Sequence, residues 1–136
     1  MLILLDSNVY VSAALTPRGP GDRIVAAAEA GVVDLVASPR LLRELAAVLS
    51  RPRFRAHLSL SEVGLFVDRM EALAVVVPDP APAGRWVRDP TDDYLVELAR
   101  AAGADLLVSG DKDLLAVDPE VVKVVTPREA ADGMSG

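Results

Sequence analysis

The stretch Leu2-Ile3-Leu4-Leu5-Asp6 begins the chain with four apolar residues that run directly into a carboxylate. A short, uninterrupted apolar run of this kind predicts a strand that is buried on both faces of a parallel sheet. The pattern returns at residues 106–113, where Leu-Leu-Val leads through Ser109-Gly110 into Asp111 and Asp113. Ligands of parallel α/β proteins bind beyond the carboxyl ends of the strands. Both stretches therefore predict acidic side chains at the edge of the sheet where a site would form.

Strand-like and helix-like patterns alternate along the rest of the chain, which predicts a parallel sheet of four or five strands with helices on its faces. The other expected strands lie at residues 32–37, 74–77, 105–109 and 121–125. Helices are expected at residues 7–15, 22–30, 38–50, 61–73 and 91–102, with a last one from residue 126. The residues expected to cap or end these helices are Asp22, Ser38, Thr91, Gly31 and Gly103. We expect a single domain over residues 1–132 and a flexible C-terminal tail over residues 133–136.

The composition fits one globular domain, because 136 residues with 51% hydrophobic and 25% charged side chains can build one core. No apolar run approaches the roughly 18 to 20 residues of a transmembrane helix. The first apolar stretch has no basic region before it, as a signal peptide would have. Without cysteine there is no disulfide framework and no thiolate metal site. We therefore expect a cytoplasmic protein that does not associate with membranes.

Charge is unevenly distributed along the chain, whose formal net charge is −6. Nine acidic residues lie within residues 89–120, against one arginine and one lysine. Residues 40–57 reverse this balance, with five arginines and a single acid, Glu44. The net negative charge disfavours extensive nonspecific binding to nucleic acid. An acidic region can nevertheless bind metal while a separate basic segment binds phosphates, and two solvated faces are the alternative.

In the first half of the chain, Asp6 and Glu44 are candidate residues of a metal site, and each also has a purely structural explanation. Asp6 can cap the helix expected at residues 7–15. Glu44 lies one helical turn from Leu41, a member of the apolar stripe, so its carboxylate should border the buried face. Burial there costs free energy unless the charge is paired or coordinated, and pairing with Arg40 is the structural alternative. Neither residue identifies a site by itself.

The remaining acids crowd two short segments, residues 89–93 and 111–113. Asp92 and Asp93 lie at a helix start, where the helix dipole favours negative charge, but capping accounts for only one or two carboxylates. Asp111 and Asp113 follow a strand through a glycine and can reach one centre from a turn, or form a plain acidic loop. An Asp–Glu–Asp–Asp set without histidine suits Mg²⁺ or Mn²⁺ rather than zinc. Such a site fits phosphodiester hydrolysis with water as the nucleophile.

Several of these segments resemble the motifs of PIN-domain nucleases. The opening motif is similar to Leu4-Leu5-Asp6-Ser7-Asn8-Val9-Tyr10-Val11-Ser12-Ala13, and the glutamate-bearing helix is similar to Ser38-Pro39-Arg40-Leu41-Leu42-Arg43-Glu44-Leu45. The C-terminal signature resembles Arg88-Asp89-Pro90-Thr91-Asp92-Asp93, then Val108-Ser109-Gly110-Asp111-Lys112-Asp113, and the closing segment resembles Thr126-Pro127-Arg128-Glu129. Each match is short, but their number and order are specific, and together they span nearly the whole chain.

The resemblance implies a three-layer α/β/α fold and a Mg²⁺- or Mn²⁺-dependent endoribonuclease, closest to the VapC-like toxins of toxin–antitoxin pairs. It implies an RNA substrate, a cognate antitoxin as partner and a homodimer. The residues that match the family's acidic site are Asp6, Glu44, Asp92 and Asp111, with Asp93 and Asp113 as supporting metal ligands. The matching polar positions are Ser7, Asn8 and Ser109, with serine at positions 7 and 109 where threonine is common. As contacts for RNA phosphates we consider Arg51, Arg53 and Arg55, from their charge alone.

Other classes of protein also place acids at strand ends. A receiver-like phosphoacceptor would carry paired acids after its first strand and a separate late lysine, whereas Asp6 stands alone and Lys112 lies between two aspartates. A PIN-like binding module without catalysis and a housekeeping RNA-processing nuclease both remain open at this level. With one tryptophan, two tyrosines and two phenylalanines, the chain offers few aromatic side chains for base stacking. The sequence therefore does not define which RNA is recognised.

Overall fold

A five-stranded parallel sheet forms the centre of the molecule in the computed structural model, which describes residues 1–82 and 84–135. Its strands are β1 (Leu2–Leu5), β2 (Asp34–Ala37), β3 (Val75–Val76), β4 (Leu106–Val108) and β5 (Val124–Val125). They lie in the order β3-β2-β1-β4-β5, and every neighbouring pair is parallel. The predicted parallel sheet is therefore confirmed, with five strands.

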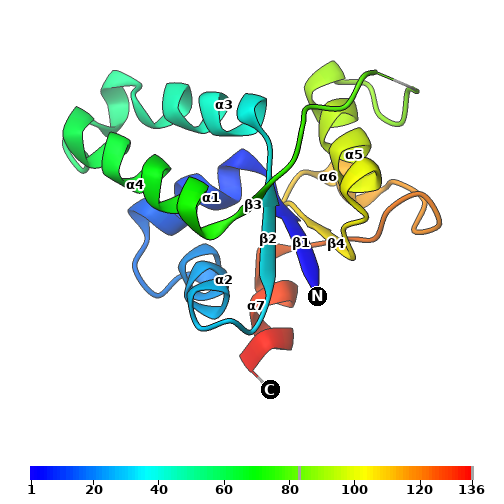
Figure 1. Cartoon of the computed structure of the whole chain (residues 1–136), viewed down its shortest axis with the longest axis horizontal. Coiled ribbons are helices and arrows are strands. Elements are labelled where there is room, and N and C mark those ends of the chain that lie inside the picture. The colour runs from blue at the N-terminus through cyan, green and yellow to red at the C-terminus, as the bar shows by residue number, and fades with distance from the viewer. Residues whose placement is uncertain (83, 136) are drawn as a thin grey trace.

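Helices cover both faces of this sheet and complete a three-layer α/β/α arrangement (Figure 1). The longer ones are α1 (Ser7–Leu15), α2 (Pro20–Glu29), α3 (Pro39–Leu49), α4 (Leu60–Leu73), α5 (Pro90–Ala102) and α7 (Pro127–Ser135). Shorter turns are the 3₁₀ helix Pro52–Phe54 and α6 (Lys112–Leu115). In Figure 1, α1 to α4 lie on one side of the sheet, and α5 and α6 lie on the other. None of the helices within the described residues is long and apolar enough to cross a membrane.

The buried core explains why the first apolar stretch forms the central strand. Ile3, Leu4 and Leu5 are fully buried, since β1 has strands on both edges and helices on both faces. Leu4 pairs with Val36 of β2, and Leu5 pairs with Val108 of β4. A strand in this position has no polar face, which is why its sequence is continuously apolar rather than alternating.

The helix boundaries follow local signals, most of which the sequence predicts. Ser38 caps α3 as expected, with its Oγ accepting a hydrogen bond of 3.2 Å from the Leu41 N–H. Gly31 and Gly103 follow α2 and α5 with φ of +77° and +68°, the left-handed conformation that glycine adopts easily. The predicted helix starts and stops at these three residues are therefore confirmed.

Three local expectations differ from the structure. The helix expected at residue 22 begins earlier, at Pro20, because proline suits the first helical turn, and Asp22 instead accepts a hydrogen bond of 2.9 Å from the Arg18 N–H. The tail expected over residues 133–136 continues α7 as far as Ser135, while Gly136 lies outside the described residues. The side chain of Thr91, expected to cap α5, is likewise outside what the structure describes.

Candidate active site

Asp6 lies where the order of the strands reverses. The chain moves from β1 to β2 on one side and later adds β4 on the other, so the carboxyl ends of β1 and β4 flank a topological switch point. Asp6 directly follows β1, is buried, and accepts a hydrogen bond of 2.8 Å at Oδ2 from the Ser109 hydroxyl beyond β4. Its Oδ1 accepts longer contacts of 3.4 Å from the Ser7 hydroxyl and the Asn8 N–H. Asp6 thus caps α1 and also faces the switch point.

The three predicted polar positions differ in what they contribute. The hydroxyls of Ser7 and Ser109 are buried and donate to the Asp6 carboxylate. The Ser109 Oγ also accepts a hydrogen bond of 3.0 Å from the Asp111 N–H, and this links the end of β4 to the next acid. Asn8 is exposed, and only its backbone N–H contacts Asp6. Ser7 and Ser109 therefore orient Asp6 through their side chains, whereas Asn8 does not.

Glu44 approaches this carboxylate from α3. Burial raises the pKa of Glu44, and the negative charge of Asp6 is the next largest cause. Asp89 adds to the increase, while the guanidinium groups of Arg40 and Arg51 oppose it. Solvent screens distant exposed charges, so the effect of Asp6 on Glu44 indicates that the fold brings the two residues near each other, although 38 residues separate them in the sequence.

Asp92 is a second acid whose pKa is raised by burial and by nearby carboxylates. Burial, and then the negative charges of nearby carboxylates, raise the pKa of Asp92 from 3.8 to about 6. Those carboxylates are, in decreasing order of effect, Asp111, Asp89, Asp6 and Asp113. Residues from the N-terminus, the middle and the C-terminal third of the chain thus form one electronegative cluster, which we call the acidic cluster: Asp6, Glu44, Asp89, Asp92, Asp111 and Asp113.

Asp111 and Asp113 occupy the short turn after β4. Asp111 caps α6, with its Oδ1 accepting a hydrogen bond of 2.8 Å from the Asp113 N–H. Both residues are exposed, so their carboxylates can rotate at little cost. The sequence interpretation of this segment as a turn was incomplete, because residues 112–115 form the single helical turn α6.

The donor chemistry of the acidic cluster suits a hard divalent cation. Carboxylate oxygens are the usual protein ligands of Mg²⁺ and Mn²⁺, and the raised pKa values of Glu44 and Asp92 indicate negative charge that lacks compensation. Within residues 1–82 and 84–135, however, no three carboxylates already stand close enough to share one ion. A shared ion would need side-chain rotations, and Mg²⁺ commonly keeps several waters and takes only one or two carboxylates directly.

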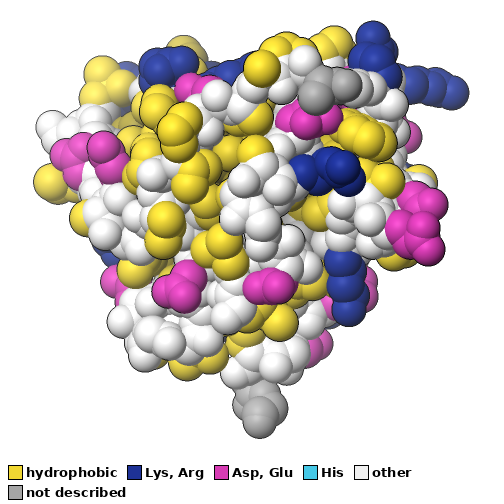
Figure 2. Space-filling model, turned by 45° about the vertical axis from the view of Figure 1, so that its right-hand side comes forward, with side chains coloured by type: hydrophobic (Ala, Val, Ile, Leu, Met, Phe, Trp, Pro, Cys, Tyr) yellow, Lys and Arg dark blue, Asp and Glu magenta, His cyan; other side chains and the backbone are white. Residues whose placement is uncertain are grey.

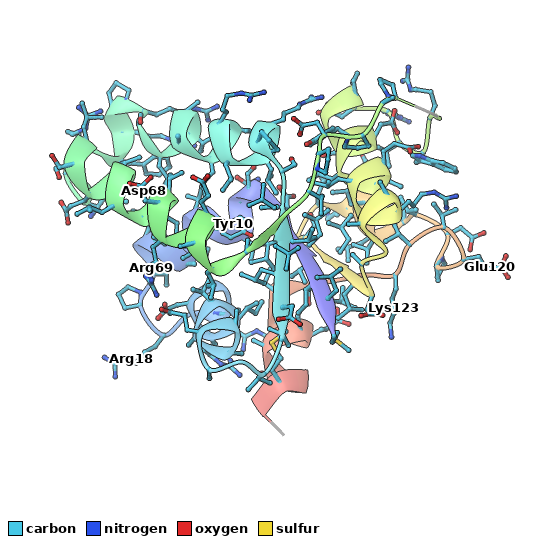
Figure 3. The ribbon with its side chains drawn as sticks, in the orientation of Figure 1. Tyr10, Arg18, Asp68, Arg69, Glu120 and Lys123 are labelled. Carbon is cyan, nitrogen blue, oxygen red and sulfur yellow. The ribbon has the colours of Figure 1, made fainter. Side chains whose placement is uncertain are left out.

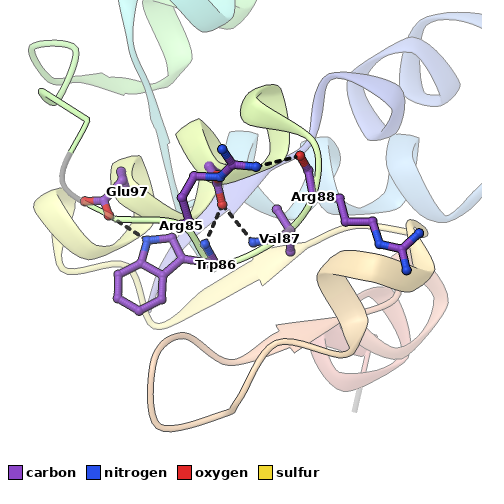
Figure 4. A network of polar contacts seen from close by, with 6 residues as sticks. Arg85, Trp86, Val87, Arg88 and Glu97 are labelled. Carbon is purple, nitrogen blue, oxygen red and sulfur yellow. Dashed lines mark hydrogen bonds and ion pairs between the residues drawn. The ribbon is translucent and has the colours of Figure 1, made fainter.

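Asp93, proposed from the sequence as a supporting ligand, has a different role. Its Oδ1 accepts hydrogen bonds of 2.6 and 2.8 Å from the N–H groups of Trp86 and Val87, and its Oδ2 lies 2.9 Å from Arg85 Nε (Figure 4). Burial opposes ionisation, but the two N–H groups and the Arg85 guanidinium outweigh it and lower the pKa of Asp93. Its carboxylate therefore anchors residues 85–87 against α5, and we do not retain it as a metal ligand.

The three arginines considered for phosphate contacts are all exposed, and they make different contacts. Arg51 lowers the pKa of Glu44. Arg53 stacks on the neighbouring Phe54 ring, 4.7 Å from its centroid, and Arg55 donates a hydrogen bond of 2.7 Å to the Ser50 carbonyl. Figure 2 shows basic side chains along the upper edge of one face, with acidic side chains beside and below them.

Two residues of the site were not assigned a role from the sequence. Arg40 precedes Glu44 by four positions and faces it on α3, a spacing that signals an ion pair as readily as a site. Asp89 precedes Asp92 by three positions at the start of α5 and raises the pKa of both Glu44 and Asp92. Helical spacing was thus the available signal for both residues.

A second polar network connects the helices that carry Glu44 and Asp92. The Tyr94 hydroxyl of α5 donates to the Asp79 carboxylate and accepts from the Ser38 hydroxyl at the start of α3. Burial, and then the hydrogen bond to Asp79, raise the pKa of Tyr94 to about 12. Asp79 also accepts a hydrogen bond of 3.1 Å from the Arg40 N–H. This Ser38–Tyr94–Asp79 network fixes α3 relative to α5.

A parallel α/β/α fold with acids converging at the switch point defines a class of protein that binds its ligand at the carboxyl edge of the sheet. A family model described as PIN domain matches residues 2–113. The chain therefore belongs to the PIN domain family, whose members are nucleases.

Individual relatives are distant in sequence. The chain is 27% identical over 137 aligned residues to the uncharacterized protein MJ1680 of Methanocaldococcus jannaschii, covering 93% of this chain and 87% of that protein. Its fold is similar to PAE2754 from Pyrobaculum aerophilum, with a TM-score of 0.68 and 16% identity over 98% of this chain and 94% of the other. It is also similar to a chain of VapBC2 from Rickettsia felis bound to a promoter DNA fragment, with a TM-score of 0.67 and 14% identity over 93% and 98% of the two chains.

Proposed function

We propose that the protein is a Mg²⁺- or Mn²⁺-dependent endoribonuclease that hydrolyses RNA phosphodiester bonds at the acidic cluster. The observation that carries this proposal is the pKa of Asp92, raised to about 6 by burial and by carboxylates from distant parts of the chain. A protein that gathers uncompensated acids at one place destabilises its own fold unless a cation is used there. Hydrolysis of RNA, rather than another phosphodiester, follows the PIN-domain resemblance of the motifs.

The residues that would hold the cation are Asp6, Glu44, Asp92 and Asp111, with Asp113 in support. When bound, Mg²⁺ or Mn²⁺ supplies charge stabilisation at the phosphoryl oxygens and activation of the attacking water. The hydroxyls of Ser7 and Ser109 orient the Asp6 carboxylate. Arg40 and Arg51 offset the negative field beside Glu44, and they are the cations best placed to attract an RNA phosphate.

We further propose that the chain acts as the toxin of a toxin–antitoxin pair in the cytoplasm, as a homodimer with a cognate antitoxin. Exposed apolar side chains support a protein partner, since Leu60 and Leu65 of α4 and Val75 and Val76 of the edge strand β3 are between 43% and 70% exposed. The apolar stripe of α3 does not contribute, because Leu41, Leu45 and Leu49 are buried in the core. A small reading frame encoded directly upstream would support the antitoxin.

Cleavage of single-stranded RNA by purified protein tests the nuclease. Asp6→Asn should reduce the cleavage rate by about a hundredfold or more, because the residue contributes both charge and ligand oxygens. Asp68→Asn, on the exposed face of α4 (Figure 3), removes the same charge away from the site and should leave the rate unchanged. Calorimetric titration with Mn²⁺ should show binding to the wild type that Asp6→Asn weakens. Equal cleavage by the wild type and Asp6→Asn, or full activity in EDTA, would exclude this function.

A further inference from the structure

A cavity of about 240 Å³ lies between the first turns of α5, Arg40 of α3 and the segment that leads into α5. Its walls include Pro80, Pro82, Pro90, the Tyr94 ring, Arg40 and Glu97. Prolines and the tyrosine ring give these walls flat apolar surfaces. The volume is below the roughly 300–1,000 Å³ of pockets that bind drug-sized ligands, so it suits one small planar group.

Glu97 brings a buried carboxylate to this cavity. It is 9% exposed, and its Oε1 accepts a hydrogen bond of 2.6 Å from the indole Nε1–H of Trp86 (Figure 4). Its Oε2 has no hydrogen-bond partner among residues 1–82 and 84–135. Glu97 lines the cavity, so this oxygen can accept a hydrogen bond from a ligand N–H group there.

Arg40 connects the cavity to the acidic cluster. Its guanidinium stacks on the Tyr94 ring, 4.1 Å from the centroid, and this contact holds it at the cavity wall. The same charge lowers the pKa of Glu44. One cation therefore borders both the proposed cleavage site and the cavity, where it can bind a phosphate between them.

We propose that this cavity binds one base of the RNA substrate next to the cleaved phosphodiester, and that Glu97 selects a base with an amino group. The proposal rests on the nuclease function. A flat base fits the proline and tyrosine walls, Arg40 contacts the adjoining phosphate, and Glu97 Oε2 accepts from the exocyclic amine, as carboxylates do with cytosine N4. Uracil presents a carbonyl oxygen at the same position, which the carboxylate repels.

Trp86 reports on this site directly, because it is the only tryptophan in the chain and it donates to Glu97. Tryptophan emission is followed while cytidine or uridine hexanucleotides are added to the wild-type protein in EDTA, which prevents cleavage. The two ligands have the same charge and ring size. We expect the cytidine hexamer to change the emission and to bind about tenfold more tightly than the uridine hexamer, the effect of one hydrogen bond to a charged group.

Glu97→Gln tests the selectivity with little change of shape. Its carbonyl oxygen can keep the Trp86 hydrogen bond, which leaves the amide NH₂ facing the cavity, so the preference should reverse toward uridine. Glu120→Gln, at the exposed end of the loop between α6 and β5 (Figure 3), removes the same charge and should retain the cytidine preference. Equal thermal melting of the variants shows that the fold is kept.

Three outcomes decide between the proposals. Equal affinity for both hexamers in the wild type, or an unchanged preference in Glu97→Gln, overturns the base site. No emission change from either hexamer, in a protein that cleaves RNA with Mg²⁺, also overturns it, leaves the nuclease standing, and favours a protein segment as occupant. Discrimination between the hexamers without any Mg²⁺-dependent cleavage keeps the base site and rejects the nuclease.

Discussion

Asp92 and Asp93 are neighbours in α5, yet their carboxylates lie in opposite electrostatic environments. Burial and surrounding acids raise the pKa of Asp92 to about 6, whereas two N–H groups and Arg85 lower the pKa of Asp93 despite its burial. Successive residues of a helix point about 100° apart. One side chain therefore reaches the acidic cluster, and the other reaches the segment at residues 85–87.

The difference separates two kinds of environment for an acid. On the side of Asp93, each acid accepts at least one hydrogen bond: Asp79 accepts from Tyr94, and Glu97 accepts from Trp86 through one of its two oxygens. On the side of Asp92, burial and the charges of neighbouring acids raise the pKa of its carboxyl group. A matched carboxylate stabilises the fold, and an unmatched one costs stability that only a ligand recovers. The surroundings of each acid, rather than the number of acids, therefore distinguish the proposed active site.

The largest expected effect is on the rate of RNA cleavage, which should depend on Asp92 far more than on Asp93. Asp92→Asn should lower the rate of RNA cleavage by about a hundredfold or more, because it removes a proposed ligand oxygen and its charge. Asp93→Asn, its matched control, should lower the melting temperature but change cleavage by folded protein only a few-fold. Cleavage assays with thermal melting measure both. A similar loss of activity in the two variants would remove the distinction.

The Tyr94 hydroxyl should account for the next largest effect. Tyr94→Phe removes its hydrogen bonds to Asp79 and Ser38 and should lower the free energy of unfolding by about 1–2 kcal/mol. Tyr10→Phe is the control, because the buried Tyr10 hydroxyl (Figure 3) has no hydrogen-bond partner among the described residues and its removal should cost nothing. Urea denaturation compares the two variants. Equal destabilisation would show that the Ser38–Tyr94–Asp79 network contributes nothing.

The pH dependence of stability should carry the signature of Asp92. Its folded-state pKa of about 6 exceeds the ordinary 3.8, so the folded protein binds the proton more tightly and becomes more stable as the pH falls from about 6 toward 4. The shift corresponds to about 3 kcal/mol, which solvent screening of the partly exposed carboxylate reduces to about 1 kcal/mol.

Asp79 and Asp93 act with the opposite sign. Their lowered pKa values stabilise the fold above the ordinary aspartate pKa, and that stability is lost below it. Melting temperatures in EDTA should therefore pass through a maximum between about pH 4 and 5. Asp92→Asn should flatten the rise from pH 7 to pH 5 and be more stable than the wild type at pH 7. A wild-type melting temperature that stays constant between pH 7 and pH 5 would contradict the raised pKa of Asp92.

The smallest effect is expected at Arg85. Its side chain is 72% exposed, so the ion pair with Asp93 is largely screened by solvent. Arg85→Gln should lower the melting temperature by only about 1–2 °C, since the two backbone N–H groups still hold Asp93. Calorimetry measures the change. A loss as large as that of Asp93→Asn would make Arg85, rather than the backbone, the main partner.

Local signals accounted for most of the fold. The apolar stretches at residues 2–5 and 106–108 form neighbouring strands. Ser38 begins a helix, and Gly31 and Gly103 follow the ends of two others, as their chemistry predicts. Expectations differed where two signals competed. Pro20 began α2 ahead of Asp22, and α7 extended through residues that composition alone suggested were loose.

The sequence predicted most residues of the acidic cluster, but it did not predict that Asp93 lies outside the cluster. Asp6 and Asp111 follow strands, so their edge of the sheet was predictable from the sequence. Asp93 could not be separated from Asp92, because the donors that engage it come from residues 85–87 and depend on how that segment folds back over α5. Arg40 was visible only as an ion-pair partner four residues from Glu44.

The sequence by itself determined the order of strands and helices, the PIN-domain motifs and the set of acids at strand ends, because these depend on hydrophobic periodicity and residue chemistry along the chain. The tertiary structure alone decided which carboxylates lack donors, how the Ser38–Tyr94–Asp79 network joins α3 to α5, and that Glu97 and Arg40 share a cavity. These properties depend on contacts between segments far apart in sequence and on burial. Only the packed chain brings such groups together and removes them from water.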